Sequence, residues 1–362
     1  MRHAKNKIAI ISFSLTGGGA ERFSGLLSCI LNDLGYEIHN IVINEEVDYD
    51  YCGPLYNLGK ITKNSYFWSR KIRKGFLLNK YLNIHEIDII IDNRSRNVFL
   101  RELLAKWIYG KRSVFYLVHS YNLNNYFPNS IFLAKMIYKQ AEKLICVSKA
   151  IEDKVKEKYG FKNTITLYNP IDLSKLIIED PKEILGQYIL FFGRLEEKSK
   201  NFSLMLEAFS ISKIHEKGYQ LLIMGDGPDT ALILAKIEQF KLSNSVKRIP
   251  YQKNPFDYVK NAKFTLLTSH YEGFPMSIIE SLALSTPVVA VNCNSGPAEV
   301  ISNGFNGLLV ENYNPNALAK AMNRLIEDED LYHICKENAP KSIQHLSVEN
   351  ISKQWNQILA KA

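Results

Sequence analysis

The chain has 362 residues, of which 46% are hydrophobic and 23% are charged, and it carries a net charge of +8. This composition is typical of a folded protein rather than a disordered one, and the length allows two domains of ordinary size. No apolar stretch approaches the ~20 residues that a membrane-spanning helix needs. We therefore expect a protein that is soluble or lies at most on a membrane surface.

The positive charge is concentrated in the first half of the chain. Residues 1–180 contain 26 Lys and Arg against 18 Asp and Glu, whereas residues 181–362 contain 19 of each. The excess is densest between Lys60 and Arg112, with 13 basic residues against four acidic ones.

The five cysteines lie far apart in the sequence, at Cys29, Cys52, Cys146, Cys293 and Cys335. No pair has the close spacing that a zinc site or a redox dithiol needs. We expect reduced, buried thiols and a cytoplasmic location.

The first residues, MRHAKNKIAIISFSL, combine basic residues with a short apolar run, as a signal peptide does. Where a small-residue cleavage site belongs, the chain has TGGGAER, a glycine loop followed by charge. The stretch is therefore interpreted as a buried strand that leads into a turn.

The first half alternates short apolar runs with stretches of helical periodicity. Residues 20–34 are predicted to form the first helix. The apolar runs predicted to form strands are KIAIISFSL, EIHNIVIN, EIDIIIDN, RSVFYLVHS and EKLICVSK. Strands that alternate with helices predict a parallel, doubly wound sheet.

The same pattern restarts in the second half, from YILFFGRL through QLLIMGDG, VKRIPY and AKFTLLTS to TPVVAVN. We predict an N-terminal Rossmann-like domain over residues 1–175, a C-terminal one over 185–340, and a helical segment over 341–362 that could pack back on the N-terminal domain. In open α/β sheets, ligands bind at the carboxyl ends of the strands. We therefore expect the binding and catalytic residues in the loops that follow strands.

The segment EGFPMSIIE follows one such strand and opens a helix near Met276. Free N–H groups at a helix start suit a diphosphate, and a glycine lets the backbone approach a ligand. Glu272 could accept hydrogen bonds from sugar hydroxyls, and Glu280 from a ribose diol. The alternative is a plain helix start with an incidental acidic neighbour and a surface glutamate. If the segment binds a sugar donor with a diphosphate and a ribose, the candidate donor-binding residues are Gly273, Phe274, Pro275, Met276, Ser277 and Glu280.

The chain resembles the retaining glycosyltransferases of the group 1 / family 4 type, which have the GT-B fold of two Rossmann-like doubly wound domains facing a cleft. The resemblance rests on the two glutamates of EGFPMSIIE and on the segment through NGFNGLLV. Earlier in the chain the other landmarks of the family occur in the family's order. They are GGGAER, a mid-domain histidine, VSKAI, YNPID, FFGRL and MGDGP. The resemblance implies a hexosyltransferase that uses a nucleotide sugar, with UDP as the expected nucleotide.

The segment FFGRLEEKSKN contains two basic residues that could bind an anion. Arg194 follows the strand and Lys200 precedes the next helix, and together they could neutralise a leaving nucleoside diphosphate. An Arg/Lys pair is by itself more often a solvated surface, and the resemblance favours the functional interpretation. The spacing selects Lys200 over the neighbouring Lys198.

The turn TGGGAER lacks the third glycine of a dinucleotide fingerprint, because Arg22 stands in its place. Gly17 and Gly18 are candidates for a backbone contact with the donor phosphate or the acceptor, as the resemblance implies.

A lone histidine at a strand end is usually structural. The resemblance places His119 near the sugar, where it could bind a hydroxyl or stabilise charge. Gly225, in MGDGPD, is expected to border the nucleoside, and Asp226 could be only a turn former.

The basic and aromatic stretch KNSYFWSRKIRKGFLLNKY could lie on an anionic bilayer. The alternative is an ordinary solvated helix. The candidate membrane contacts are Phe67, Trp68, Arg70, Lys71, Arg73 and Lys74. The sequence has no RNA-binding motif, so no nucleic-acid partner is expected.

No metal and no other cofactor are expected. The acidic triplets DYD and DED lack the strand-end setting of a metal-binding D-x-D motif, and Arg194, Lys200 and helix dipoles could hold the diphosphate. We expect transfer to a hydroxyl of a growing, lipid-linked surface glycan (lipopolysaccharide, O-antigen or capsule) at the inner face of the cell membrane. A sugar-nucleotide epimerase of the same fold and a non-catalytic scaffold for glycan assembly are the alternatives.

Overall fold

The computed structural model describes residues 6–64, 66–176, 178 and 186–361, without the side chains of Phe67 and Trp68. The chain divides into two compact units. The first unit runs to Asn169 and also includes the C-terminal stretch from Val348, and the second unit is Pro170–Ser347. Residues 170–175 and 341–347 thus belong to the second unit, whereas the sequence analysis assigned them to the N-terminal domain and the C-terminal segment.

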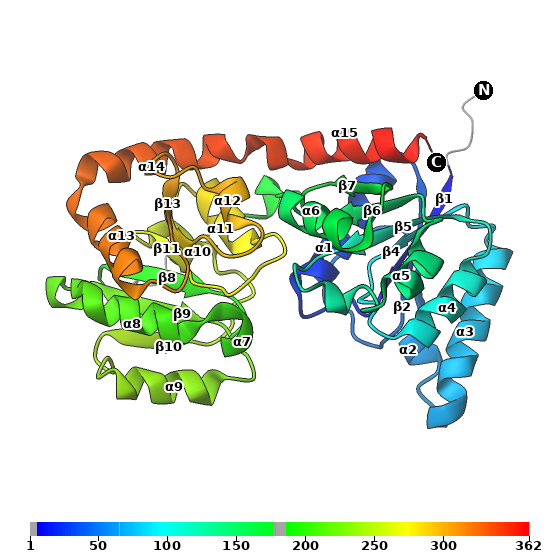
Figure 1. Cartoon of the computed structure of the whole chain (residues 1–362), viewed down its shortest axis with the longest axis horizontal. Helices are drawn as coiled ribbons and strands as arrows, with labels where there is room; N and C mark the ends of the chain where they lie inside the picture. Colours follow the sequence, from blue (N-terminus) through cyan, green and yellow to red (C-terminus); the bar gives the residue numbers. More distant parts are fainter. Residues whose placement is uncertain (1–5, 65, 177, 179–185, 362) are drawn as a thin grey trace. The chain divides into compact units, whose positions relative to one another are not determined.

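The first unit contains a sheet with helices around it (Figure 1). Among the described residues the sheet is parallel and has seven strands, in the order β3-β2-β1-β4-β5-β6-β7. Its strands are β1 (Lys7–Ser12), β2 (Glu37–Val42), β3 (Leu55–Asn57), β4 (Ile89–Asp92), β5 (Ser113–Val118), β6 (Lys143–Cys146) and β7 (Thr164–Thr166). The helices between them are α1 (Gly19–Asp33), α2 (Leu58–Ile61), α3 (Phe67–Ile84), α4 (Phe99–Tyr109), α5 (Ile131–Tyr138) and α6 (Lys149–Tyr159).

The second unit repeats this design with a parallel sheet whose described strands number six, in the order β10-β9-β8-β11-β12-β13. Its strands are β8 (Tyr188–Phe192), β9 (Gln220–Met224), β10 (Val246–Ile249), β11 (Thr265–Leu267), β12 (Val288–Val291) and β13 (Gly307–Val310). Its helices are α7 (Glu197–Lys200), α8 (Phe202–Ser212), α9 (Thr230–Gln239), α10 (Phe256–Asn261), α11 (Met276–Ala283), α12 (Pro297–Val300), α13 (Pro315–Glu327) and α14 (Glu329–Ser342).

Both faces of the second sheet are buried along its strands β8, β11 and β12, which explains why these strands are largely apolar. Successive side chains of a strand point to opposite faces. Ile189 and Phe191 accordingly pack with α8 and α13, whereas Leu190 and Phe192 pack with Val259 of α10. The continuous apolar pattern of β8 follows from this burial on two sides.

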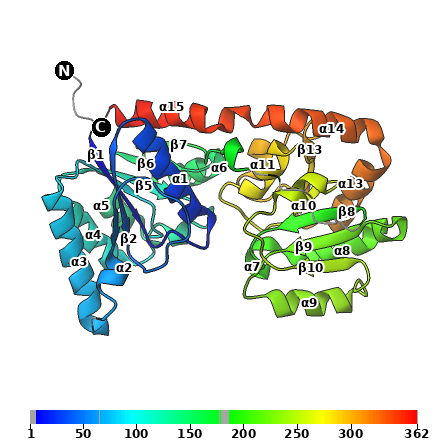
Figure 2. The same cartoon turned by 180° about the vertical axis from the view of Figure 1, so that it is seen from behind.

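The C-terminal helix α15 (Val348–Leu359) belongs to the core of the first unit. Ile351, Trp355 and Leu359 repeat at helical spacing and pack in one cluster with α1, beside which α15 lies in Figure 2. Trp355 is fully buried, and the Tyr36 hydroxyl donates a 3.2 Å hydrogen bond to Asn356. The last residues of the chain therefore complete the domain that the first residues begin.

The expectation of reduced thiols is wrong for one pair of cysteines, because a disulfide joins Cys29 of α1 to Cys52. The loop after β2 folds back onto α1, where the Cys52 amide donates a 2.9 Å hydrogen bond to Ser28 Oγ. Tertiary packing brings together two residues that are 23 positions apart. Cys146, Cys293 and Cys335 are free and buried.

Candidate active site

The second unit joins two of the predicted site residues directly. Lys200 Nζ lies 2.6 Å from Glu272 Oε1, and Ser269 Oγ donates a 2.6 Å hydrogen bond to the same oxygen. The two charged side chains follow β8 and β11, which are neighbours in the sheet, so their loops meet at its carboxyl edge. Their side chains are 20% and 12% exposed, which leaves both within reach of a ligand.

The backbone of this edge is held by a buried threonine. Thr268 Oγ1 donates to the carbonyl oxygens of Lys200 and Asn201, at 2.9 and 3.2 Å. Asn201 has a left-handed backbone and caps α8 with its side chain, which accepts from the Leu204 amide. These bonds fix the turn from which Lys200 projects. Sequence reasoning missed Thr268 and Ser269, although both follow directly the strand that precedes Glu272.

Arg194 lies at the same edge but stands apart from the Lys200–Glu272 pair. It is exposed, and the structure records no hydrogen bond or ion pair between its guanidinium and a described residue. It follows Gly193, whose amide bonds to the Met224 carbonyl at 3.0 Å. The guanidinium is therefore available to an anionic ligand.

The helix α11 begins at Met276, as the segment EGFPMSIIE predicted. Phe274 and Pro275 are buried and anchor the turn, whereas Gly273, Met276 and Ser277 keep partial exposure. Ser295 Oγ donates a 2.7 Å hydrogen bond to the Gly273 carbonyl. The partly exposed residues are the ones that remain open to a ligand.

Glu280 is only 5% exposed on α11 and interacts with other residues of the protein. The structure thus excludes the alternative of a free surface glutamate, and it does not place Glu280 in the Lys200–Glu272 pair.

Gly225 has a structural reason to be glycine. Its φ is +142°, and a Cβ there would lie 1.9 Å from the Gly193 carbonyl oxygen. The loops after β8 and β9 therefore touch at this point. Asp226 is an ion-pair partner of Arg248 and accepts a 3.1 Å bond from the Tyr251 amide, so it ties β9 to the chain after β10.

In the first unit, polar residues gather at the carboxyl ends of β1, β4 and β5. Gly17 (φ +90°) and Gly18 are exposed and precede α1. His119 follows β5, and its Nε2 lies 2.5 Å from Asn93 Oδ1. Burial, with a contribution from the charge of Arg96, lowers the pKa of His119 to about 3, so the imidazole is neutral at physiological pH.

A buried charged network follows β4 and was not identified from the sequence. Arg94 pairs with Asp92 at 2.6 Å and with Glu102 at 3.0 Å, and the Tyr109 hydroxyl donates to Asp92 at 2.8 Å. All four residues are at most 5% exposed. Charges placed directly after the fully apolar run of β4 were the signal that could have revealed the network.

Arg96 belongs to the same network, and its charge acts on His119. Its guanidinium donates to the carbonyls of Asp92, Arg94 and Leu117, and its Nε is buried without a hydrogen-bond partner among the described residues. Three tyrosine rings surround it within 5.0–5.8 Å, those of Tyr116, Tyr126 and Tyr138.

Two of the basic residues proposed to contact a membrane are used within the unit. Arg70 donates to the Gly59 carbonyl at 3.4 Å, and Lys74 donates to the Ile43 carbonyl at 2.5 Å. Burial lowers the pKa of Lys74. Lys71 and Arg73 are exposed on α3, whereas the side chains of Phe67 and Trp68 lie outside the described part of the chain.

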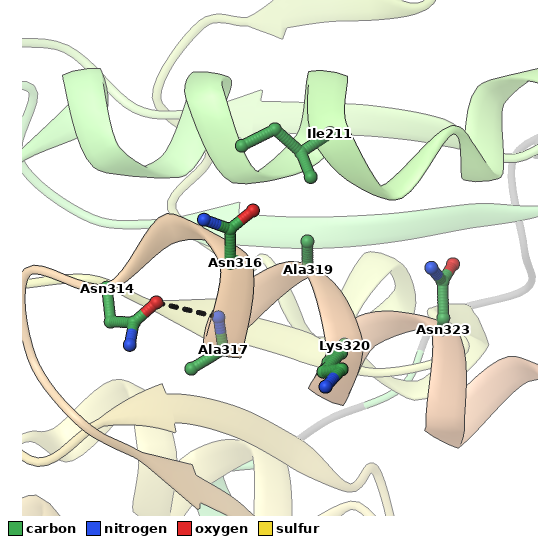
Figure 3. A pocket seen from close by; sticks show the side chains of 7 residues that line it. All are labelled: Ile211, Asn314, Asn316, Ala317, Ala319, Lys320 and Asn323. Atoms are coloured by element: carbon green, nitrogen blue, oxygen red, sulfur yellow. Dashed lines mark hydrogen bonds between the residues drawn. The ribbon is translucent and has the colours of Figure 1, made fainter.

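A pocket lies between α8 and α13 (Figure 3). Its lining consists of Ile211 and of α13 residues and its cap, including Asn316, Lys320 and Asn323. Asn314 uses its side chain to cap α13 by accepting from the Ala317 amide at 2.9 Å. None of the residues predicted for the site lines this pocket.

Within the described residues, no three His, Cys, Asp or Glu side chains are grouped so that they could hold a metal ion. Over the same residues, no helix combines the length and the apolar character that crossing a bilayer requires.

Comparisons with known proteins place the chain among glycosyltransferases. The model of group 1 glycosyl transferases matches residues 179–342, and that of glycosyltransferase family 4 matches residues 17–175. The N-acetylgalactosamine-N,N'-diacetylbacillosaminyl-diphospho-undecaprenol 4-alpha-N-acetylgalactosaminyltransferase of Campylobacter jejuni is 30% identical over 355 residues, which cover 92% of this chain and 93% of the relative. The amylovoran biosynthesis glycosyltransferase AmsD of Erwinia amylovora is 26% identical, covering 94% of this chain and 96% of the relative.

Solved structures identify the fold as GT-B. Anabaena HepE in complex with UDP superposes with a TM-score of 0.77 at 19% identity, covering 98% of this chain and all of that one. TarM of S. aureus, in a complex that contains UDP, gives a TM-score of 0.78 at 14% identity, covering 98% and 99%. With its two parallel-sheet units and a 30% identical relative along nearly its whole length, the chain belongs to the group 1 / family 4 glycosyltransferases.

Proposed function

We propose that this protein is a retaining hexosyltransferase that moves a sugar from a UDP-sugar to a hydroxyl group of a lipid-linked surface glycan. The observation that carries the proposal is the pair of Lys200 and Glu272, joined at 2.6 Å where the loops after β8 and β11 meet. The UDP complexes of HepE and TarM support the choice of nucleotide.

In this proposal the diphosphate binds to Arg194 and Lys200. The Lys200 ammonium has three N–H donors, of which the bond to Glu272 uses one. Arg194 supplies a fork of donors that can bind two phosphate oxygens. Together they stabilise the negative charge that grows on the leaving phosphate as the bond to the anomeric carbon breaks.

Glu272 orients the sugar rather than attacking it. Its Oε1 already accepts bonds from Lys200 and Ser269, which makes it a poor nucleophile. Its Oε2 can accept a hydrogen bond from a sugar hydroxyl, and Glu280 would serve the ribose. Front-face attack then retains the configuration. The acceptor oxygen bonds to the anomeric carbon, the phosphate leaves, and the acceptor proton passes to a leaving phosphate oxygen.

Gly17, Gly18 and Gly225 would bring backbone close to the donor phosphates and the nucleoside, and His119 would contact the sugar. Their place at the carboxyl ends of β1, β9 and β5 supports these roles.

The experiment that tests the donor is a screen of nucleotide sugars by thermal shift and by hydrolysis. A bound donor should raise the melting temperature, and the slow release of UDP identifies the sugar. If no nucleotide sugar shifts the transition, the assignment of the second unit to donor binding is wrong. An isomerised nucleotide sugar without a new glycosidic bond would favour the epimerase alternative.

We propose that transfer needs no metal, because Lys200 and Arg194 can neutralise the diphosphate. Activity should persist in EDTA, and its loss with recovery on adding Mg²⁺ or Mn²⁺ would contradict this part of the proposal.

A lipid-linked acceptor would bring the protein to the inner face of an anionic membrane. The Campylobacter jejuni relative is named for a diphospho-undecaprenol glycan, which supports such an acceptor. The helices α3, α4 and α5 carry exposed apolar side chains, among them Phe76 (67% exposed), Trp107 (74%) and Phe132 (74%). The only acidic residue of these three helices is Glu102, which is buried and paired with Arg94. Such a surface, apolar and basic without exposed carboxylates, suits anionic lipids.

Co-sedimentation with vesicles that contain anionic lipid tests this contact. We expect the double substitution of Leu100 and Trp107 by serine, or charge reversal at Lys71 and Arg73, to release the protein. Serine at Leu232 and Leu234, which are exposed on α9 of the other unit, is the matched control. Equal binding of all variants would contradict the proposed membrane contact.

A further inference from the structure

The histidine after β5 is held by an asparagine whose own orientation is fixed. Asn93 Nδ2 lies 2.7 Å from the carbonyl oxygen of Ala20 and 2.8 Å from Ser24 Oγ. A backbone carbonyl can only accept a hydrogen bond, so the atom that faces it must be the amide nitrogen. The Asn93 oxygen is thereby directed toward His119.

This orientation decides which nitrogen of His119 carries the proton. The Asn93 Oδ1 atom can only accept, and it lies 2.5 Å from His119 Nε2, so Nε2 must be the donor. A neutral imidazole has one N–H, and Nδ1 is then left with its lone pair. Within the described residues the structure records no hydrogen bond of Nδ1, and His119 as a whole residue is half-buried.

The surroundings keep the ring neutral and in place. The buried guanidinium of Arg96 is the charge that acts on His119, and it disfavours an imidazolium. Tyr126 also contacts His119, through a hydrogen bond from the His119 backbone, and burial raises the pKa of Tyr126 to about 12. The Phe23 ring packs against the imidazole with centroids 5.3 Å apart. Three elements, α1, the loop after β4 and β5, thus converge on one side chain.

We propose that Asn93 is a positioning residue that fixes His119 as the neutral tautomer protonated on Nε2, so that Nδ1 accepts a hydrogen bond from a hydroxyl group of the bound sugar. The role toward sugar rests on the proposed function, whereas the tautomer does not. His119 in this state cannot donate a proton to an oxygen atom from Nδ1, so it selects ligands that present a hydroxyl hydrogen there.

The tautomer is measured by ¹⁵N NMR of histidine-labelled full-length protein, with the His119 signals identified by their loss in His119→Gln. In the wild type, Nε2 should show the shift of a protonated nitrogen and Nδ1 that of an unprotonated one, at neutral pH and down to about pH 5. A wild-type His119 protonated on Nδ1, or charged at neutral pH, overturns the proposal without any variant being made.

Asn93→Asp tests the positioning role. A carboxylate at this place stabilises the imidazolium, so the pH at which His119 takes up a second proton should rise. Asn83→Asp is the control, because it adds the same charge on α3 beside Arg112, where it should leave the His119 signals unchanged. Unaltered His119 titration in Asn93→Asp contradicts the proposal, and if that variant does not fold, Asn93→Ala with a mixed tautomer is the second test.

Kinetics separate this inference from the proposed function. With the donor identified in the screen, Asn93→Ala should lower kcat/KM at neutral pH, by up to about a hundredfold if the ring is displaced. Asn93→Asp should move the acid limb of the pH profile upward. If the wild type transfers no sugar while the tautomer is as expected, the proposed function fails and the positioning by Asn93 stands. Full activity in both variants contradicts the role toward sugar.

Discussion

The two units bear polar residues at the same place in the fold, the carboxyl ends of parallel strands, but they treat charge in opposite ways. In the second unit, Lys200 and Glu272 are partly exposed and Arg194 is exposed. In the first unit, Asp92 and Arg94 are buried and paired, and His119 is neutral. One edge offers charge to a ligand, and the other satisfies its charges internally.

This difference indicates which kind of ligand group each edge can bind. A diphosphate needs exposed cations, and neutral hydroxyls need oriented donors and acceptors. The second unit provides the former, and the Asn93–His119 pair of the first unit provides the latter. The predictions below test whether the charges of each unit have these separate roles, with the largest expected effect first.

The strongest effect on stability should come from the buried network of the first unit. Arg94→Met leaves Asp92 and Glu102 as buried carboxylates that lack this partner, and we expect a loss of about 3–5 kcal/mol in the free energy of unfolding. Denaturant unfolding followed by tryptophan fluorescence measures it. Lys217→Met, which removes an exposed pair with Glu327, should cost at most about 1 kcal/mol. Equal losses in the two variants would show that burial does not distinguish the pairs.

In the second unit the corresponding substitution should affect turnover instead. Lys200→Ala is expected to lower kcat/KM about 10²–10³-fold, because it removes a cation that stabilises the leaving diphosphate. Its melting temperature should change little, since the side chain is partly exposed. Lys198→Ala on the same helix is the matched control and should behave as the wild type. Comparable activity of Lys200→Ala and Lys198→Ala would remove Lys200 from the site.

The disulfide should stabilise the first unit alone. A disulfide that closes a loop of 23 residues stabilises the folded unit by about 3 kcal/mol. Cys52→Ser or a thiol reductant should therefore lower the free energy of unfolding of the unit that contains α1 by about this amount. The double substitution of Cys29 and Cys52 by serine should make the protein insensitive to the reductant. Five reactive thiols in denatured protein prepared without reductant would show that the bond does not form where the protein is made.

The last prediction concerns the pH dependence of stability, where the expected change is the smallest when it is taken per pH unit. The pKa of His119 is about 3 in the folded state against 6.5 in the unfolded chain, so only the unfolded chain binds a proton between these values. Stability therefore decreases as the pH falls from about 6.5 toward 3, by up to about 1.4 kcal/mol per pH unit from this one group. His119→Gln should flatten the profile by one proton over this window. An unchanged slope would show that His119 titrates normally.

The sequence alone predicted the polar residues at the carboxyl edge of the second sheet more completely than those of the first sheet. Arg194, Lys200 and Glu272 follow strands at recognisable spacing, and the start of α11 at Met276 was predicted to the residue. The helix over residues 20–34 was predicted to within one residue at each end. Local patterns reach this far because strand burial, turns and helix starts are encoded within a few neighbouring residues.

Only the tertiary structure decided which residues far apart in the chain meet. The disulfide between Cys29 and Cys52, the insertion of Trp355 into the first unit, and the bond from Asn93 to His119 all join separate elements. The sequence determined the two parallel-sheet units and marked candidate site residues after their strands, since both depend on local periodicity. It could not determine the buried ion pairs or the protonated nitrogen of His119, because those depend on packing between strands and helices that are not neighbours in sequence.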